Sequence, residues 1–300
     1  MVIKKATITF LVVLNAVEIL TARETQIMNM LGKTEAIDAV HIYLTDTLAT
    51  AGANAKNEGD DYSFGARTTP SRVTNVVQHL QVPFAVSDTQ RDISHYHGRD
   101  ELQRQTEKAL MEFANDAEFN LVRQTLTSGA SGTAPTMSGI IEGISTSANT
   151  TAHTSGTAWS ASILDGLVKD NWDNSNGDLA TDLFMGSILR KNTDAFTQKS
   201  NVVVNGPTVS TIVRTVSTYQ TAFSTLNIHT HRFIQQTADA TGRVLGLRPD
   251  KLKVAFLRRP YIDTDVARTG PTTKRSVNAS MTLEVRNKNS NFFASGFLKA

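Results

Sequence analysis

The chain is organised around residues 98–127, GRDELQRQTEKALMEFANDAEFNLVRQTLT. No proline or glycine interrupts this stretch after Gly98, and Asp100 and Glu101 place negative charge where the dipole of a helix favours it. Apolar residues recur at spacings of three and four, while charged or amide residues, Glu118 among them, occupy the remaining positions. The pattern predicts one amphipathic helix over residues 99–127. Its buried stripe is expected to contain Leu102, Thr106, Ala109, Phe113, Ala117 and Leu121, widened by Leu110 and Ala114.

A helix of this size is expected to have other elements packed along its length. At about 1.5 Å per residue it would measure about 40 Å, which exceeds the usual three or four turns of a globular helix. We expect strands from the last fifty residues to pack on its apolar stripe.

Composition excludes several classes of protein. The 300 residues contain no cysteine, which rules out disulfides, thiolate metal sites and cysteine nucleophiles. The net charge of +2 is unevenly distributed: residues 243–300 hold twelve Lys and Arg against four Asp and Glu, or +8, and the other 242 residues hold 18 against 24, or −6. An acidic body with a basic terminal region suits electrostatic self-association or contact with a polyanion, although scattered solvated charge is the simpler interpretation.

The N-terminal segment has two interpretations. Residues 1–15, MVIKKATITFLVVLN, imitate a secretory signal because two lysines precede an apolar run. The run is short, contains threonines, and continues into residues 16–31, which fit an amphipathic helix. No stretch approaches the roughly 18 apolar residues that span a membrane.

A long hairpin is expected after this segment. Residues 41–48 place Ile42, Leu44 and Leu48 on one face at period two, and residues 71–87 alternate again, so both are predicted to be strands. The intervening residues 51–67 are rich in glycine, asparagine and acidic side chains, which is typical of an exposed loop tip. A two-stranded arm of this kind is marginally stable alone and needs a surface to lie on.

The rest of the chain mixes helices and strands. Residues 128–156 are rich in Gly, Ser and Thr and predict an exposed loop. The expected fold class is α+β. Helices are predicted at 161–168 and 184–196, and strands at 202–204, 210–216, 228–234, 243–247, 251–257, 276–286 and 291–298.

No motif for catalysis or cofactor binding is convincing. Gly32-Lys33-Thr34 imitates the end of a phosphate-binding loop, but Ile27 occupies the position of the required first glycine. The pairs His95/His97 and His229/His231 each offer two imidazoles without a further ligand at useful spacing. We therefore predict no enzyme activity, no metal and no cofactor.

The order of these elements resembles the major capsid proteins of tailed bacteriophages, which have the Hong Kong 97-type fold. Short segments in nearly every part of the chain are also similar to a phage major head protein family. They are Asn54–Gly59, Val86–Thr89, Met137–Ile141, Tyr219–Phe223, Lys251–Arg258, Val266–Gly270 and Met281–Asn287.

The resemblance implies a division of the chain into parts. Residues 1–35 would be an N-terminal arm, 36–90 an extended loop, 91–130 the part of the peripheral domain with the spine helix, 131–250 mainly the axial domain, and 251–300 the remaining peripheral-domain strands. The loop would lie over a neighbouring subunit, and basic residues of 243–288 would be partners for its acidic tip. Some relatives crosslink a loop lysine to an asparagine of a neighbour, and Lys56 is the candidate here. The expected intersubunit residues are Lys56, Glu58, Asp60, Asp61 and Arg67.

The implied function is self-assembly, through pentamers and hexamers, into an icosahedral head that encloses double-stranded DNA in the virion. We expect assembly in the host cytoplasm, with a separate scaffolding protein, a portal protein and a possible decoration protein as partners. We also expect diffuse contact with DNA and no contact with a membrane. Two alternatives stay open: an encapsulin-like nanocompartment around protein cargo, and a secreted β-rich binding or adhesion protein.

Overall fold

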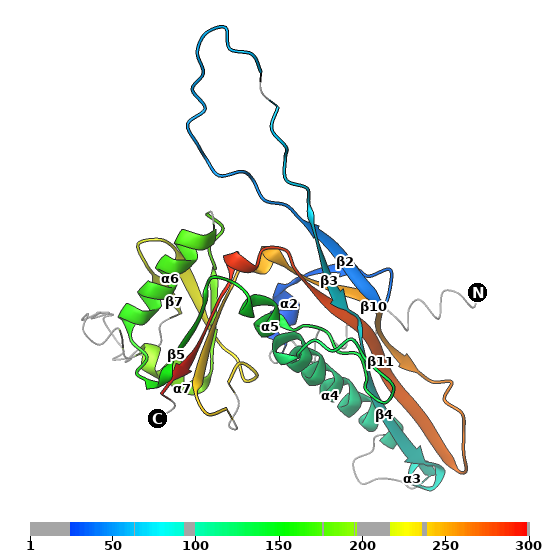
Figure 1. The fold of residues 1–300 in the computed structure, drawn as a ribbon. Coiled ribbons are helices and arrows are strands. Elements are labelled where there is room, and N and C mark those ends of the chain that lie inside the picture. Colours follow the sequence, from blue (N-terminus) through cyan, green and yellow to red (C-terminus); the bar gives the residue numbers. More distant parts are fainter. Residues whose placement is uncertain are drawn as a thin grey trace, which may run out of the picture.

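The computed structural model describes residues 25–62, 64–92, 100–175, 177–194, 196, 217–235 and 239–298. Two sheets lie side by side, and a long loop projects from one end of the molecule (Figure 1). Residues 1–15, most of the predicted helix at 16–31, His95, His97 and the predicted strands at 202–204 and 210–216 lie outside the described residues.

The first sheet has four strands that come from distant parts of the chain. They are β1 (Gly32–Glu35), β4 (Gln78–Ser87), β10 (Leu252–Asp263) and β11 (Thr272–Val285), in the order β1-β10-β11-β4. β10 and β11 form an antiparallel pair, β4 extends it antiparallel to β11, and β1 runs parallel to β10. The sheet therefore combines strands from three of the five parts into which the resemblance divides the chain: 1–35, 36–90 and 251–300.

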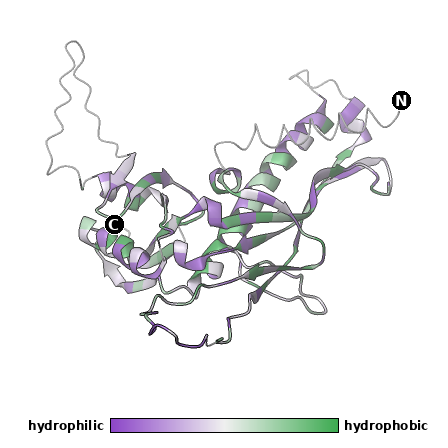
Figure 2. Ribbon diagram, turned by 90° about the horizontal axis from the view of Figure 1, so that it is seen from above, coloured by the Kyte–Doolittle hydropathy of each residue, from purple (hydrophilic) through white to green (hydrophobic). Residues whose placement is uncertain are grey.

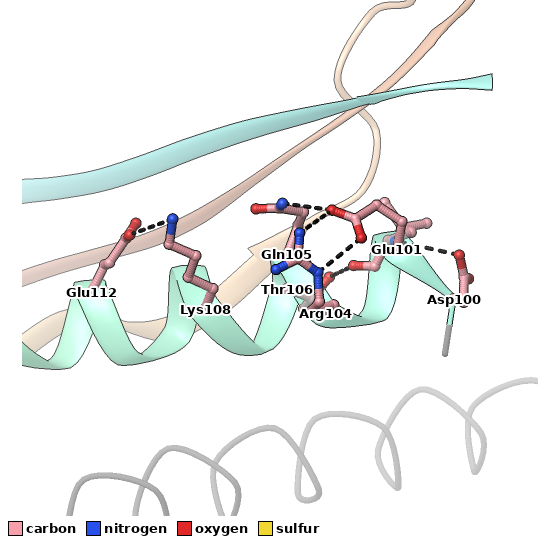
Figure 3. Close-up of polar contacts among 8 residues, drawn as sticks. Asp100, Glu101, Arg104, Gln105, Thr106, Lys108 and Glu112 are labelled. Atoms are coloured by element: carbon pink, nitrogen blue, oxygen red, sulfur yellow. Dashed lines mark hydrogen bonds and ion pairs between the residues drawn. The ribbon is translucent and has the colours of Figure 1, made fainter. Parts of the chain in front are cut away.

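The predicted long helix is α4, Glu101–Arg123. Asp100 caps it by accepting a hydrogen bond from the Leu102 amide at 3.1 Å (Figure 3). The helix ends four residues before the predicted end at Thr127. Gln124 is extended there because its carbonyl accepts from the Gly139 amide at 2.8 Å, and Thr127 forms a bridge with Thr136.

The apolar stripe of α4 packs on the four-stranded sheet. Leu102, Ala109, Phe113, Ala117 and Leu121 are buried, as predicted. Strands of the last fifty residues cover the stripe through residues such as Val277 and Met281, and β4 adds Leu80, Val82 and Phe84. Figure 2 shows green, hydrophobic residues interspersed with purple, hydrophilic ones on the strands of the body of the molecule. One prediction for this helix is wrong: Glu118, assigned to the solvated face, is completely buried.

The predicted strand at 71–87 is two strands. β3 (Ser71–Val76) pairs with β2 (Val40–Thr45) in a separate antiparallel ribbon, whereas β4 pairs with β11. The chain changes partner at Val77, whose amide donates to the Ala39 carbonyl at 2.8 Å. Val77 packs with Ala36 and Ala255, so a small apolar cluster holds the base of the ribbon to the first sheet.

The second sheet has six strands in the order β5-β12-β9-β6-β8-β7. Its apolar core includes Leu164 and Leu167 of α6 and Leu189 of α7. The predicted helix at 184–196 is partly wrong, because β6 contains residues 184 and 185 and α7 follows. The strands are β5 (Thr150–Thr157), β6 (Asp182–Met185), β7 (Thr218–Gln220), β8 (Thr225–Thr230), β9 (Gly242–Leu247) and β12 (Phe292–Phe297), and the longer helices are α6 (Ala161–Ser175) and α7 (Ser187–Asp194).

Short elements join these parts. α2 (Gln26–Met30) packs against α4, α3 (Asp88–Asp92) follows β4, and α5 (Ile140–Ser145) lies between α4 and the second sheet. The 3-10 turn η2 (Pro249–Lys251) connects β9 to β10, and η3 (Lys288–Ser290) connects β11 to β12. At η3, the Asn289 carbonyl accepts from the amides of Asn149 and Asn171 at 2.5 and 2.9 Å. The crossing between the two sheets is therefore held by buried amide side chains.

Candidate intersubunit surface

The segment between β2 and β3 is an extended loop without internal packing. Residues 46–70 form no helix or strand at any described position, and all of them are exposed. Leu48, Tyr62 and Phe64 have exposed fractions of 99%, 91% and 95%. The loop projects well beyond the rest of the subunit (Figure 1). Three large apolar side chains are therefore in full contact with water, where they gain none of the free energy of apolar burial.

The five predicted loop residues lie on this segment. Lys56, Glu58, Asp60, Asp61 and Arg67 are exposed, and none forms an ion pair with any other described residue. A turn at the tip is closed by two contacts of residue 60: its carboxylate accepts from the Asn57 amide at 3.2 Å, and its amide donates to the Asn57 carbonyl at 3.2 Å. Gly59, with φ of +88°, supplies the left-handed conformation that this turn needs.

In the ribbon of β2 and β3, the β2 strand places apolar side chains on the outer face, where Ile42 pairs with Thr74 and Leu44 with Arg72. Ile42 and Leu44 are exposed, whereas His41 and Tyr43 point to the first sheet. The period-two pattern of β2 is confirmed, but its apolar side faces away from the subunit. Ile42 and Leu44 precede the loop that carries the exposed side chains of Leu48, Tyr62 and Phe64.

The inner face is anchored by polar contacts to β11. His41 Nε2 lies 2.7 Å from Glu284 Oε1, and Arg286 Nε donates to the other Glu284 oxygen at 3.0 Å. The Tyr43 hydroxyl oxygen accepts from the Val285 amide at 3.1 Å. Burial and then the charge of Glu284 raise the pKa of Tyr43, against the lowering effect of that hydrogen bond. The phenol is therefore neutral and serves as an acceptor.

A second anchor joins β3 and β4 to the segment after α4. The Asn75 amide donates to the Leu283 carbonyl at 2.8 Å and to the Ser138 carbonyl at 3.1 Å, while its oxygen accepts from the Ser138 amide at 2.9 Å. Gln78 donates to the side chain of Asn120 in α4 at 3.0 Å and accepts from the Met137 amide, after α4, at 3.3 Å. These contacts fix the direction in which the ribbon leaves the subunit, and only the loop beyond it is free.

Sequence reasoning did not find these anchors. His41, Asn75 and Glu284 carry no shared spacing or motif, since more than 200 residues separate the first from the last. The sequence held one signal for these contacts. Polar residues alternate with Ile42 and Leu44 in β2, so the two faces of this strand need different partners.

Six of the twelve cations in the basic terminal region form ion pairs with acids of their own subunit. Arg243 lies 3.5 Å from Asp239, Lys251 lies 2.8 Å from Asp178, and Arg259 lies 3.5 Å from Glu35. Arg248 donates to the Leu179 carbonyl at 3.1 Å. These cations are therefore partly neutralised, which reduces their availability to the acidic loop tip.

The two histidines of the described pair bind different carboxylates. His229 Nε2 contacts Asp182 at 3.0 Å, and His231 Nε2 contacts Glu118 at 2.9 Å, so the two rings have separate carboxylate partners. Among the described residues no group of three or more His, Asp or Glu side chains is arranged to hold a metal ion. In the same part of the chain, no helix is long and apolar enough to cross a membrane.

The fold defined by the two sheets, the long helix and the projecting loop is that of the Hong Kong 97-type capsid proteins. The "capsid of Myoviridae Phage XM1" matches with a TM-score of 0.58 at 12% identity, over 89% of this chain and 90% of that one. The "capsid of native GTA particle" matches with a TM-score of 0.61 at 13% identity, over 92% and 91%. The SrpI encapsulin from Synechococcus elongatus PCC 7942 matches with a TM-score of 0.60 at 10% identity, over 91% and 87%.

The family described as SU10 major capsid protein matches residues 7–297, and the chain belongs to this family. No curated protein sequence matches the chain. The chain is therefore a structural protein that self-associates into the capsid of a virion, which confirms the fold and the role that the resemblance implied. The alternative of a secreted binding or adhesion protein is wrong.

Proposed function

We propose that this chain forms the icosahedral head shell of a tailed phage around double-stranded DNA, and that the extended loop of each subunit lies on a neighbouring copy. The observation that carries the proposal is the apolar surface on a rigidly anchored arm. Five apolar side chains of this arm are exposed in the single subunit: Leu48, Tyr62 and Phe64 on the loop, and Ile42 and Leu44 on the ribbon.

A neighbouring copy is the occupant that this arrangement favours. Burying fully exposed leucine, tyrosine and phenylalanine side chains would contribute about 1.5–3 kcal/mol each. Each such contact is weak for an isolated pair of subunits, but a closed shell repeats it around every subunit. The exposed charges Lys56, Glu58, Asp60, Asp61 and Arg67 would then select the register of the loop on its neighbour.

The further partners follow from the proposed role. A scaffolding protein, a portal protein, a decoration protein and assembly in the host cytoplasm are the expectations for a head of this kind. The division into an arm (1–35), an extended loop (36–90), peripheral segments (91–130 and 251–300) and a mainly axial segment (131–250) is proposed for the assembled shell. No enzymatic step is part of the proposal.

A nanocompartment shell is the second candidate, because an encapsulin has a similar fold over most of the chain. The contents of purified particles separate the two. We expect electron microscopy of the protein expressed with its neighbouring genes to show icosahedral particles that contain nuclease-protected double-stranded DNA. Particles filled with one cargo protein and free of DNA would contradict the phage-head proposal.

A further inference from the structure

Glu118 is completely buried on a helix whose exposed face carries other acidic residues, such as Glu112 (Figure 3). Its Oε1 accepts from the Ile27 amide at 2.9 Å, and its Oε2 accepts from the Met28 amide at 3.0 Å. His231 Nε2 lies 2.9 Å from Oε1. One carboxylate therefore contacts three segments: α4 itself, α2 near the start of the described chain, and the turn after β8.

The direction of the histidine contact follows from its second nitrogen. The Phe233 amide donates to His231 Nδ1 at 3.3 Å, so Nδ1 is unprotonated and Nε2 carries the hydrogen that is donated to Glu118. All three groups around the carboxylate are thus N–H donors, and its two oxygens are the acceptors. The amides of Ile27 and Met28 belong to the first turn of α2, where backbone amides have no partner within the helix.

Packing around the carboxylate joins the same segments. Ile27 and Leu121 belong to one apolar core, and the ring of Phe233 lies edge-on to Phe119 at 5.8 Å. Further along the helix, Arg123 donates to the Phe233 carbonyl at 3.4 Å and forms two hydrogen bonds of 2.7 Å with Asp239. The turn after β8 is therefore held against α4 at more than one place, and Glu118 in addition accepts hydrogen bonds from two amides of α2.

We propose that Glu118 is the positioning residue that fixes α2 against α4, and that it also ties the turn after β8 to the same helix. Glutamine is the informative substitution because it keeps the shape. Its NH₂ group would face an N–H donor, so at least one of the three hydrogen bonds is lost. A buried donor left without a partner destabilises its own segment.

Hydrogen exchange on the full-length chain, followed by mass spectrometry, tests the proposal. We expect Glu118→Gln to accelerate exchange at residues 27–31 and 232–235 by about ten-fold, with less than about a two-fold change in β11. Glu112→Gln, on the exposed face of the same helix, is the matched control and should change none of these regions. Unchanged exchange at 27–31, or an equal increase throughout the chain, would overturn the proposal.

A second variant separates the contact of Glu118 with His231 from its contacts with the amides of α2. His231→Phe keeps an aromatic ring but removes the Nε2 donor, while the Ile27 and Met28 amides keep their acceptor. It should accelerate exchange at 232–235 and leave 27–31 nearly unchanged. The reverse pattern would overturn the assignment of Glu118 as the shared partner. Neither readout depends on shell assembly, so a failure here is distinguishable from a failure of the head-shell proposal.

Discussion

The imidazole of His41 lies 2.7 Å from the carboxylate of Glu284, a residue 243 positions later in the chain. Both side chains are almost fully buried, and Arg286 completes the cluster. This contact ties the base of the projecting ribbon to the central strand pair of the first sheet. The contact holds the ribbon in a fixed position on the subunit, whereas the tip of the loop forms no contact of this kind with the described part of its own subunit.

The substitution Glu284→Ala is expected to lower the free energy of unfolding by about 3 kcal/mol, because it leaves His41 buried without its partner. Urea unfolding of the unassembled subunit measures this. Glu112→Ala is the control: Glu112 pairs with Lys108 at 3.6 Å on the exposed face of α4, and such a pair contributes less than about 1 kcal/mol. Equal effects of the two substitutions would contradict a structural role for the buried pair.

Phe113→Ala should lower the free energy of unfolding by about 3–5 kcal/mol, because Phe113 is buried between α4 and the first sheet and its removal leaves a cavity. Met111, a neighbour on the same helix with an exposed fraction of 44%, provides the matched control. We expect Met111→Ala to change the unfolding free energy by less than about 0.5 kcal/mol. A small effect of Phe113→Ala would show that the stripe is not the main contact of the helix.

Deletion of residues 52–66 should leave a folded, soluble subunit that does not form stable shells. Every described residue of this segment is exposed, so circular dichroism and the midpoint of thermal unfolding should stay close to those of the intact chain. Electron microscopy should show few or no closed particles. Normal shells from the deletion variant would exclude the loop as an intersubunit contact.

The stability of the subunit should depend on pH through Asp182. Burial alone raises the pKa of Asp182, but hydrogen bonds from His229 and Thr181, together with the charge of His229, outweigh burial and lower it. A carboxyl whose pKa is lower in the folded state stabilises the fold above its unfolded pKa of about 3.9, and this contribution is lost as the pH falls through the folded pKa.

Asp182→Asn should therefore reduce the free energy of unfolding by about 1 kcal/mol at pH 7, and the difference from the unaltered chain should shrink below about pH 4. Urea unfolding at pH 7, 5 and 3 measures the trend. A difference that stays constant down to pH 3 would show that the charge of Asp182 does not contribute.

Binding of DNA by isolated subunits should be weak, independent of sequence and reduced by salt. A shell lining needs only a favourable potential towards phosphate, and several basic residues of the terminal region already have acidic partners in the subunit. Fluorescence anisotropy with two unrelated duplexes at increasing salt measures this. Tight binding that prefers one duplex at physiological salt would contradict the prediction.

Local patterns in the sequence were sufficient to predict the main helix, the exposed loop and the α+β fold class. The stripe of Leu102, Phe113 and Leu121 repeats with the period of a helix, and a repeat of that kind predicts which face is buried whatever covers it. The glycines and charges of residues 51–67 exclude a packed element for equally local reasons. The order of such elements along the chain then pointed to the capsid fold.

Contacts between distant segments could not be predicted in this way. Glu118 was assigned to the solvated face because an isolated carboxylate is costly to bury, and only α2 and the turn after β8 supply the donors that remove this cost. The change of partner at Val77 and the pairing of His41 with Glu284 likewise depend on where β11 lies. Local patterns report which face of an element is apolar, whereas the identity of the group opposite each face depends on how the whole chain folds.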